Sequence, residues 1–164
     1  MGTGKSSVGR LVADQLRFSF LDTDELIEER AGRSIREIFA QDGEAAFREH
    51  ERSVVAELRE RTNTVIATGG GLVVNPENLA SLKSHALVVC LWASPETIWE
   101  RVRNQTHRPL LNDPDPLTRI RQLLSERRPH YRQADVLMNT AVRSLNEVAQ
   151  QVLHQFHLVR STQR

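Results

Sequence analysis

The chain begins with MGTGKSSVGR, a stretch whose side chains could hold phosphate groups. Gly4, Lys5 and Ser6 match the end of the phosphate-binding pattern G-x-x-x-x-G-K-[ST], whose leading glycine would fall before residue 1. In such a loop, backbone N–H groups surround the phosphates, the lysine bridges the outer phosphates and the hydroxyl binds Mg²⁺. A flexible tail ahead of a helix would have the same sequence, so the rest of the chain must decide between the two.

Carboxylates and a guanidinium follow at spacings that could serve a nucleotide and a second substrate. Asp22 and Asp24 flank Thr23 at the end of a predicted strand, which suits a metal ion together with a base or a substrate anchor. Either aspartate could instead cap the following helix. Arg48 and Glu51 are three residues apart on a predicted helix, so the glutamate could fix the arginine as a fork for a substrate carboxylate. A solvated surface pair is the alternative.

Three consecutive glycines, Gly69–Gly71, follow another predicted strand. A simple turn needs one glycine, so this run predicts a backbone that a ligand approaches closely. Arg108 precedes Pro109 in a proline-rich loop, where its charge could close over phosphates. Arg127 and Arg128 end a predicted helix, where a favourable interaction with the helix dipole is the simpler explanation.

The elements that must position these residues alternate along the chain. Strands are predicted at 18–22, 64–68, 87–92 and 136–140, and helices at 5–16, 34–39, 44–61, 95–103, 117–127 and from 144 onward, with a loop at 104–116. Ser34 with Glu37, and Ser144 with Glu147, form capping-box patterns. The alternation predicts an α/β fold with a parallel sheet covered on both faces, in which ligands bind beyond the carboxyl ends of the strands. This places the phosphate loop, the aspartates and the glycine run at one edge.

Length and composition limit the alternatives. The 164 residues predict one domain, and a net charge of +1 argues against a nucleic-acid binder. A single cysteine, Cys90, allows no internal disulfide, and the six histidines show no spacing of metal ligands. Because the sequence has neither a signal-peptide pattern nor an apolar stretch long enough to span a membrane, we expect a cytoplasmic protein without membrane partners.

Taken in order, the motifs resemble those of the shikimate kinase family. They are G-T-G-K-S-S-V-G-R, L-D-T-D, G-R-S-I-R-E-I-F, D-G-E-A-A-F-R-E, T-G-G-G, R-P-L-L and R-R-P-H-Y, and they extend from Met1 to about Asn139. Each motif is weak alone, whereas the ordered set is specific. The resemblance implies an enzyme that transfers the γ-phosphate of ATP to the 3-hydroxyl of shikimate, on the way to chorismate and the aromatic amino acids. It also implies a monomer that binds small molecules.

The resemblance assigns roles to individual residues. Nucleotide contacts are implied for Gly2, Thr3, Gly4, Lys5, Ser6, Ser7, Arg101 and Arg108, and shikimate contacts for Asp24, Arg48, Gly69, Gly70, Gly71 and Arg127. Mg²⁺ is implied at Ser6 and Asp22, and catalysis by Lys5, Asp24 and Arg108. Phe39, Phe47 and Glu51 would line or brace the pocket. The segment Ala141-Val142-Arg143 matches the family's adenine-flanking loop poorly.

The resemblance also implies a three-layer P-loop kinase fold with strand order 2-3-1-4-5. It forms a single domain over 1–164, with a shikimate-binding helical region at about 24–61 and a lid at about 104–116. The first, central strand is missing from this chain, so we expect that the natural protein starts upstream of Met1. A kinase of another small hydroxy acid such as gluconate, and a non-catalytic module that binds shikimate or ATP, remain as alternative functions.

Overall fold

The computed structural model describes residues 2–104 and 113–162. Its helices are α1 (Lys5–Leu16), α2 (Thr23–Ala31), α3 (Ile35–Gln41), α4 (Gly43–Leu58), α5 (Pro76–Lys83), α6 (Pro95–Val102), α7 (Pro116–Tyr131) and α8 (Leu145–Thr162), with a 3-10 turn η1 (Leu72–Val74). Its strands are β1 (Ser19–Asp22), β2 (Thr64–Ala67), β3 (Val89–Trp92) and β4 (Val136–Asn139). Most of the predicted lid segment lies outside the described residues.

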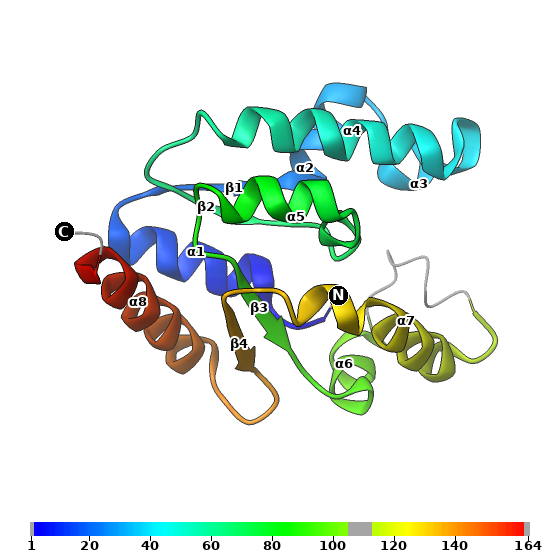
Figure 1. Ribbon diagram of the computed structural model, residues 1–164. Helices are drawn as coiled ribbons and strands as arrows, with labels where there is room; N and C mark the ends of the chain where they lie inside the picture. Colours follow the sequence, from blue (N-terminus) through cyan, green and yellow to red (C-terminus); the bar gives the residue numbers. More distant parts are fainter. Residues whose placement is uncertain (1, 105–112, 163–164) are drawn as a thin grey trace.

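The strands form two parallel pairs (Figure 1). β1 pairs with β2, and β3 pairs with β4, in registers that place Asp22 opposite Ala67 and Trp92 opposite Asn139. Among the described residues, no strand joins β2 to β3. The pairs correspond to positions 2-3 and 4-5 of the predicted order, on either side of its central strand. The predicted α/β fold with parallel strands and flanking helices is confirmed.

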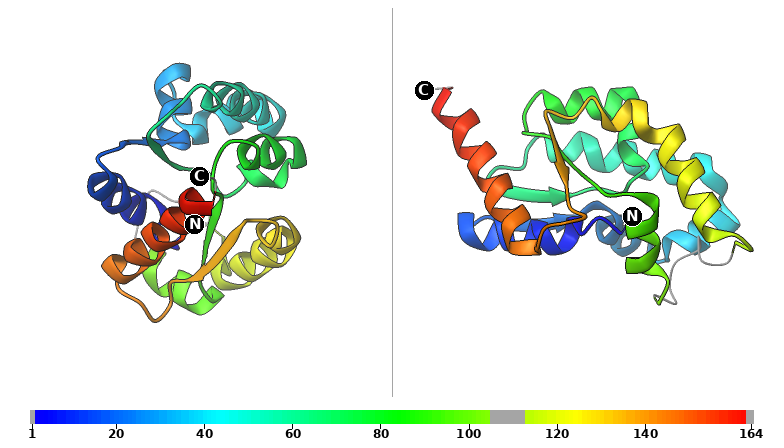
Figure 2. Two further views of the ribbon diagram at one scale, coloured as in Figure 1. Left: turned by 60° about the vertical axis from the view of Figure 1, so that its left-hand side comes forward. Right: turned by 90° about the horizontal axis from the view of Figure 1, so that it is seen from below.

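One hydrophobic cluster contacts both strand pairs. We call it the α1–α8 cluster, and it consists of Val8, Val12, Val148, Ala149 and Leu153. Val65 of β2 and Leu91 of β3 both pack against it. Figure 2 shows α8 crossing beside α1 at an angle, and side-chain packing here takes the place of a backbone ladder between the two pairs.

Two further clusters cover the outer parts of the fold. The α4 cluster consists of Ile27, Ile38, Phe47, Val54, Val55, Leu58, Leu72 and Leu82, and it supports the helical region on the β1–β2 side. Ala93, Ile98, Val102 and Ile120 form the third cluster and join α6 to α7. Residues expected to hold ligands therefore lie on elements that are each anchored by a buried face.

Local sequence signals predicted several helix boundaries correctly. In both predicted capping boxes the glutamate carboxylate accepts from the serine backbone N–H at 2.8 Å, at Ser34 and at Ser144. Helix α5 was not predicted, although the sequence carries its signals: Asn75 accepts from the Glu77 N–H, and Pro76 occupies the first helical position.

The predicted end of α7 at Arg127 is wrong, because the helix continues to Tyr131. Pro129 lies inside it and, having no N–H, cannot donate to the carbonyl of Ser125. Beyond the proline, the Arg132 N–H donates to the Arg128 carbonyl at 3.1 Å and closes the last turn. In residues 2–104 and 113–162, every helix is too short or too polar to cross a lipid bilayer.

Candidate active site

The phosphate loop has the backbone conformation that its glycines allow. Gly2 and Gly4 have φ of 65° and 86°, backbone values that residues other than glycine rarely adopt. Gly4 is the residue before α1, whose N-terminus is a favourable place for an anion. Thr3 is buried, and its hydroxyl has no hydrogen-bond partner within the described part of the chain. Lys5 and Ser6 begin the helix half-buried, and Ser7 is exposed.

Asp22 connects the phosphate loop to α2. Its Oδ2 accepts from the Ser6 hydroxyl at 2.7 Å, and its Oδ1 accepts from the Asp24 N–H at 3.0 Å. Asp22 therefore caps the following helix, which was the alternative that the sequence left open, and it also accepts a hydrogen bond from Ser6. A hydroxyl and a carboxylate are oxygen ligands of the kind that suits Mg²⁺, which usually takes one or two protein ligands alongside waters and substrate phosphates. The two side chains fit that ion.

Asp24 is the carboxylate with the most altered acidity in this region. Burial and the negative charge of Asp22 raise its pKa to about 6, and the positive charge of Lys5 opposes that rise. A carboxylate with a pKa near neutrality can accept a proton from a bound hydroxyl at physiological pH.

Arg48 is held by two carboxylates on its own helix. Its Nη1 donates to Glu51 at 2.7 Å and its Nη2 donates to Glu44 at 2.6 Å. Glu51 is only 1% exposed, so the pair is not a solvated surface pair. Burial raises the pKa of Glu51, while the positive charges of Arg48 and Arg127 lower it. Arg127, half-buried on α7, therefore acts on the same region as Arg48.

The glycine run lies against both Asp24 and Arg48. A side chain at Gly69 would collide with the Asp24 carboxylate, and a Cβ at Gly71 would lie 2.6 Å from Arg48 Nη1. Gly69 donates its N–H to the buried hydroxyl of Thr23 at 3.1 Å. A side chain at either glycine would therefore displace the Asp24 carboxylate or the Arg48 guanidinium from the position that it now has.

Tyr131 is a contact of the glycine run that sequence analysis missed. Its hydroxyl donates to the Gly70 carbonyl at 2.8 Å. The tyrosine ends the R-R-P-H-Y motif, but nothing in that motif indicates which distant backbone group its hydroxyl would meet.

Other predicted residues lie around this cluster. Arg101 donates to the Thr140 carbonyl at 2.6 Å and to the Gly2 carbonyl at 3.4 Å, so it connects the phosphate loop to the segment after β4. Phe39 is exposed, and its ring centroid lies 4.8 Å from that of the buried Phe47. The predicted lid residue Arg108 lies outside the described residues.

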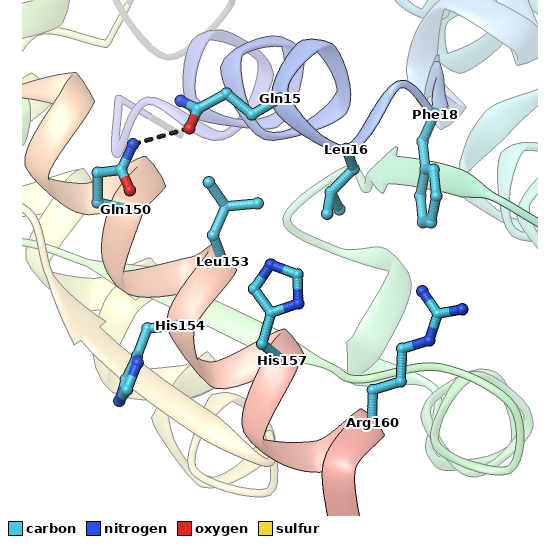
Figure 3. Close-up of a pocket in the computed structure, with 8 residues that line it drawn as sticks. All are labelled: Gln15, Leu16, Phe18, Gln150, Leu153, His154, His157 and Arg160. Carbon is cyan, nitrogen blue, oxygen red and sulfur yellow. Dashed lines mark hydrogen bonds between the residues drawn. The ribbon is translucent and has the colours of Figure 1, made fainter.

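A separate hollow of about 580 Å³ lies between α1 and α8 (Figure 3). It is lined by Gln15, Leu16, Phe18, Gln150, Leu153, His154, His157 and Arg160. None of these is a predicted site residue. The hollow adjoins the C-terminal end of α1, whereas the phosphate loop precedes its N-terminal end, roughly 18 Å away for a helix of this length.

Known proteins that closely resemble this chain in sequence or in fold belong to one family. The family model for shikimate kinase matches residues 1–157. A shikimate kinase from Caldanaerobacter subterraneus subsp. tengcongensis is 44% identical over 156 residues, which cover 95% of this chain and 91% of the relative.

Two solved structures are similar over nearly the whole chain. Shikimate kinase from Acinetobacter baumannii in complex with shikimate has a TM-score of 0.90 at 38% identity and covers 98% of this chain and 89% of its own. Shikimate kinase from Bacteroides thetaiotaomicron has a TM-score of 0.89 at 32% identity, with coverages of 96% and 94%. The chain belongs to the shikimate kinase family.

Proposed function

We propose that this protein phosphorylates the 3-hydroxyl of shikimate with ATP and releases shikimate 3-phosphate and ADP, a step towards chorismate and the aromatic amino acids. The observation that carries the proposal is one continuous set of contacts. It runs from Ser6 through Asp22 and Asp24 to the glycine run and Arg48. A phosphate-binding loop and a site for a small hydroxy acid therefore share one edge of the fold.

The nucleotide side is formed by the loop from Gly2 to Ser7. ATP carries about four negative charges, which Lys5, the α1 N-terminus and a bound metal ion would offset. Ser6 and Asp22 would hold Mg²⁺, which when bound neutralises charge on the phosphates. The buried Thr3 hydroxyl offers the nucleotide a further polar group. Arg101 would stack on adenine beside the loop.

The shikimate side needs cations at one end and an acceptor at the other. Arg48 and Arg127 would bind the carboxylate, and the half-buried Asp24 would hold the hydroxyls. The backbone of Gly69, Gly70 and Gly71 would lie against the ring, where no side chain intervenes. This division of charge matches a molecule with one carboxylate and three hydroxyls.

In the reaction, the 3-hydroxyl oxygen forms a bond to the γ-phosphorus while the bond between that phosphorus and the oxygen of ADP breaks. The transition state of such a transfer is loose, so alignment and charge stabilisation do most of the catalysis. Asp24 would accept the hydroxyl proton as the new bond forms, which its pKa of about 6 permits at neutral pH. Lys5 would stabilise charge on the transferred group, as would Arg108.

We further infer a single domain over 1–164 with a shikimate-binding helical region at about 24–61. We also infer a monomeric, cytoplasmic enzyme without membrane partners, and the balanced charge of +1 argues against a nucleic-acid partner.

A coupled assay tests the function directly. ADP release is measured with ATP and Mg²⁺ in the presence of shikimate or of gluconate, and the phosphorylated product is identified by mass spectrometry. We expect turnover with shikimate only. Turnover with gluconate would favour a kinase of another small hydroxy acid, whereas shikimate binding without any product would indicate a non-catalytic binding module.

A further inference from the structure

A single hydrogen bond connects the glycine run to a helix from the other side of the fold. The hydroxyl of Tyr131, the last residue of α7, donates to the carbonyl of Gly70 at 2.8 Å, across 61 positions of sequence. Tyr131 is the only tyrosine in the chain, and it lies half-buried. A phenol placed in this way has one polar atom, and that atom is committed to one backbone group.

The glycine run is anchored from two sides. From α2, the buried hydroxyl of Thr23 accepts from the Gly69 N–H at 3.1 Å. From α7, Tyr131 binds the next residue, Gly70. Glycine backbone has more accessible conformations than any other, so three in a row keep one conformation only where the surroundings fix it. The two anchors supply that restraint.

The position of this run matters because its neighbours are the groups proposed to hold shikimate. Gly69 lies against the Asp24 carboxylate and Gly71 against the Arg48 guanidinium, so a Cβ at either place would displace the end of that side chain. A shift of the run would therefore change the space between the two side chains. Arg127 precedes Tyr131 by four residues and so shares its face of α7.

We propose that Tyr131 is a positioning residue for shikimate: its hydroxyl holds Gly70 so that the glycine run, Asp24, Arg48 and Arg127 keep one mutual arrangement. This inference rests on the proposed function. Tyr131 acts through the backbone that it binds, so the ring serves for packing, and the hydroxyl sets the position of the loop together with the Thr23 anchor.

The variant Tyr131→Phe tests the proposal, because it removes the hydroxyl and keeps the ring. We expect the dissociation constant and KM for shikimate to rise about three- to tenfold, the effect of losing one hydrogen bond. The KM for ATP should change by less than about twofold and Tm should stay close to that of the wild type, because the lost bond touches neither the phosphate loop nor a core cluster. Hydrogen exchange at the amides of Leu72 and Val74, which donate to Gly69 and Gly71, should become faster.

Ser84→Ala is the matched control. It removes another hydroxyl that donates to a backbone carbonyl, that of Ser81 at 2.7 Å, at the end of α5 and outside the site. We expect it to leave both KM values unchanged.

The outcomes separate the inference from the function on which it rests. Absence of shikimate 3-phosphate with the wild-type protein would overturn the proposed function. Normal wild-type turnover with an unchanged shikimate KM in Tyr131→Phe would overturn the role of Tyr131. Equal losses for ATP and shikimate, together with a lowered Tm, would indicate a general structural role and would likewise overturn it.

Discussion

At neutral pH Asp24 is ionised, and its buried charge lowers the free energy of unfolding of the protein. Its pKa is near 3.8 in the unfolded chain and about 6 in the folded protein, mainly because of burial. The folded state therefore holds the Asp24 proton more tightly, and the stabilisation that comes from this proton is lost as the pH rises from about 4 through 6. A shift of about two pKa units corresponds to about 3 kcal/mol at most.

We predict that Asp24→Asn is inactive with shikimate and more stable than the wild type at pH 7.5. The amide carries no charge to bury, so the free energy of unfolding should rise by about 1–3 kcal/mol. The gain should shrink as the pH is lowered towards 4, where Asp24 itself is protonated. Urea unfolding at several pH values measures both effects. An Asn variant that is less stable at every pH would contradict the assignment of a strained, functional carboxylate.

A second prediction concerns the affinity of the Arg48→Ala variant for shikimate. Arg48→Ala should weaken shikimate binding by about 2–4 kcal/mol, because the substrate carboxylate loses its charged partner, while ATP still binds. Titration calorimetry with each ligand measures this split.

Arg52→Ala is the control for Arg48→Ala. Arg52 lies on the same helix and pairs with Glu49 at the same spacing of three residues, but both side chains are exposed. It should leave both affinities unchanged. Equal shikimate binding by the two variants would remove Arg48 from the site.

Among the elements, α1 is placed against β1 by a residue without a side chain. A Cβ at Gly9 would lie 2.7 Å from the ring of Phe20, and that ring also lies under the Arg10 guanidinium at 4.3 Å. The ring is therefore restrained on two sides. This packing sets the approach of α1 to β1, and with it the contact between Ser6 and Asp22.

We predict that Gly9→Ala destabilises the protein by about 1–3 kcal/mol, the usual cost of overpacking, and weakens Mg²⁺-dependent ATP binding. Helix propensity alone predicts the opposite sign, a gain of about 1 kcal/mol. Thermal unfolding together with ATP titration distinguishes the two. Asp14→Ala, at an exposed position of the same helix, is the control and should change neither quantity. A Gly9→Ala variant that is more stable than the wild type would show that the Phe20 ring can accommodate the added methyl group and would contradict the prediction.

Elements whose signals are local could be predicted from the sequence, whereas contacts between distant segments could not. The capping boxes at Ser34 and Ser144 specify helix starts within four residues, and both formed as expected. The hydrogen bond from Tyr131 to Gly70 joins residues 61 positions apart, and the sequence does not indicate which backbone carbonyl the tyrosine hydroxyl will bind. The length of α7 was missed for a related reason, since its last turn is stabilised beyond Pro129 by bonds that the proline does not touch.

At the scale of the whole molecule, side chains rather than a backbone ladder join the two strand pairs in the described residues. Val65 and Leu91 come from different pairs and pack against the same α1–α8 cluster. The α4 cluster contacts Leu21 and Ile66 of the β1–β2 pair, and on the other side it reaches only Val88, the residue before β3, among the described residues. The cooperativity between the halves should therefore depend more on the α1–α8 cluster, which contacts residues within strands of both pairs, than on the α4 cluster.

We predict that Val148→Ala and Val54→Ala, which remove the same atoms at positions that are each 1% exposed, have different effects on hydrogen exchange. Each should cost about 1–3 kcal/mol, through lost burial and a small cavity. Because the α1–α8 cluster touches both pairs, Val148→Ala should accelerate amide exchange in β2 and in β3 alike. Val54→Ala should accelerate exchange mainly in β1 and β2. Exchange measured by mass spectrometry resolves these strands as separate peptides, and a Val148→Ala variant that loosens β3 and β4 alone would show that something other than this cluster couples the two halves.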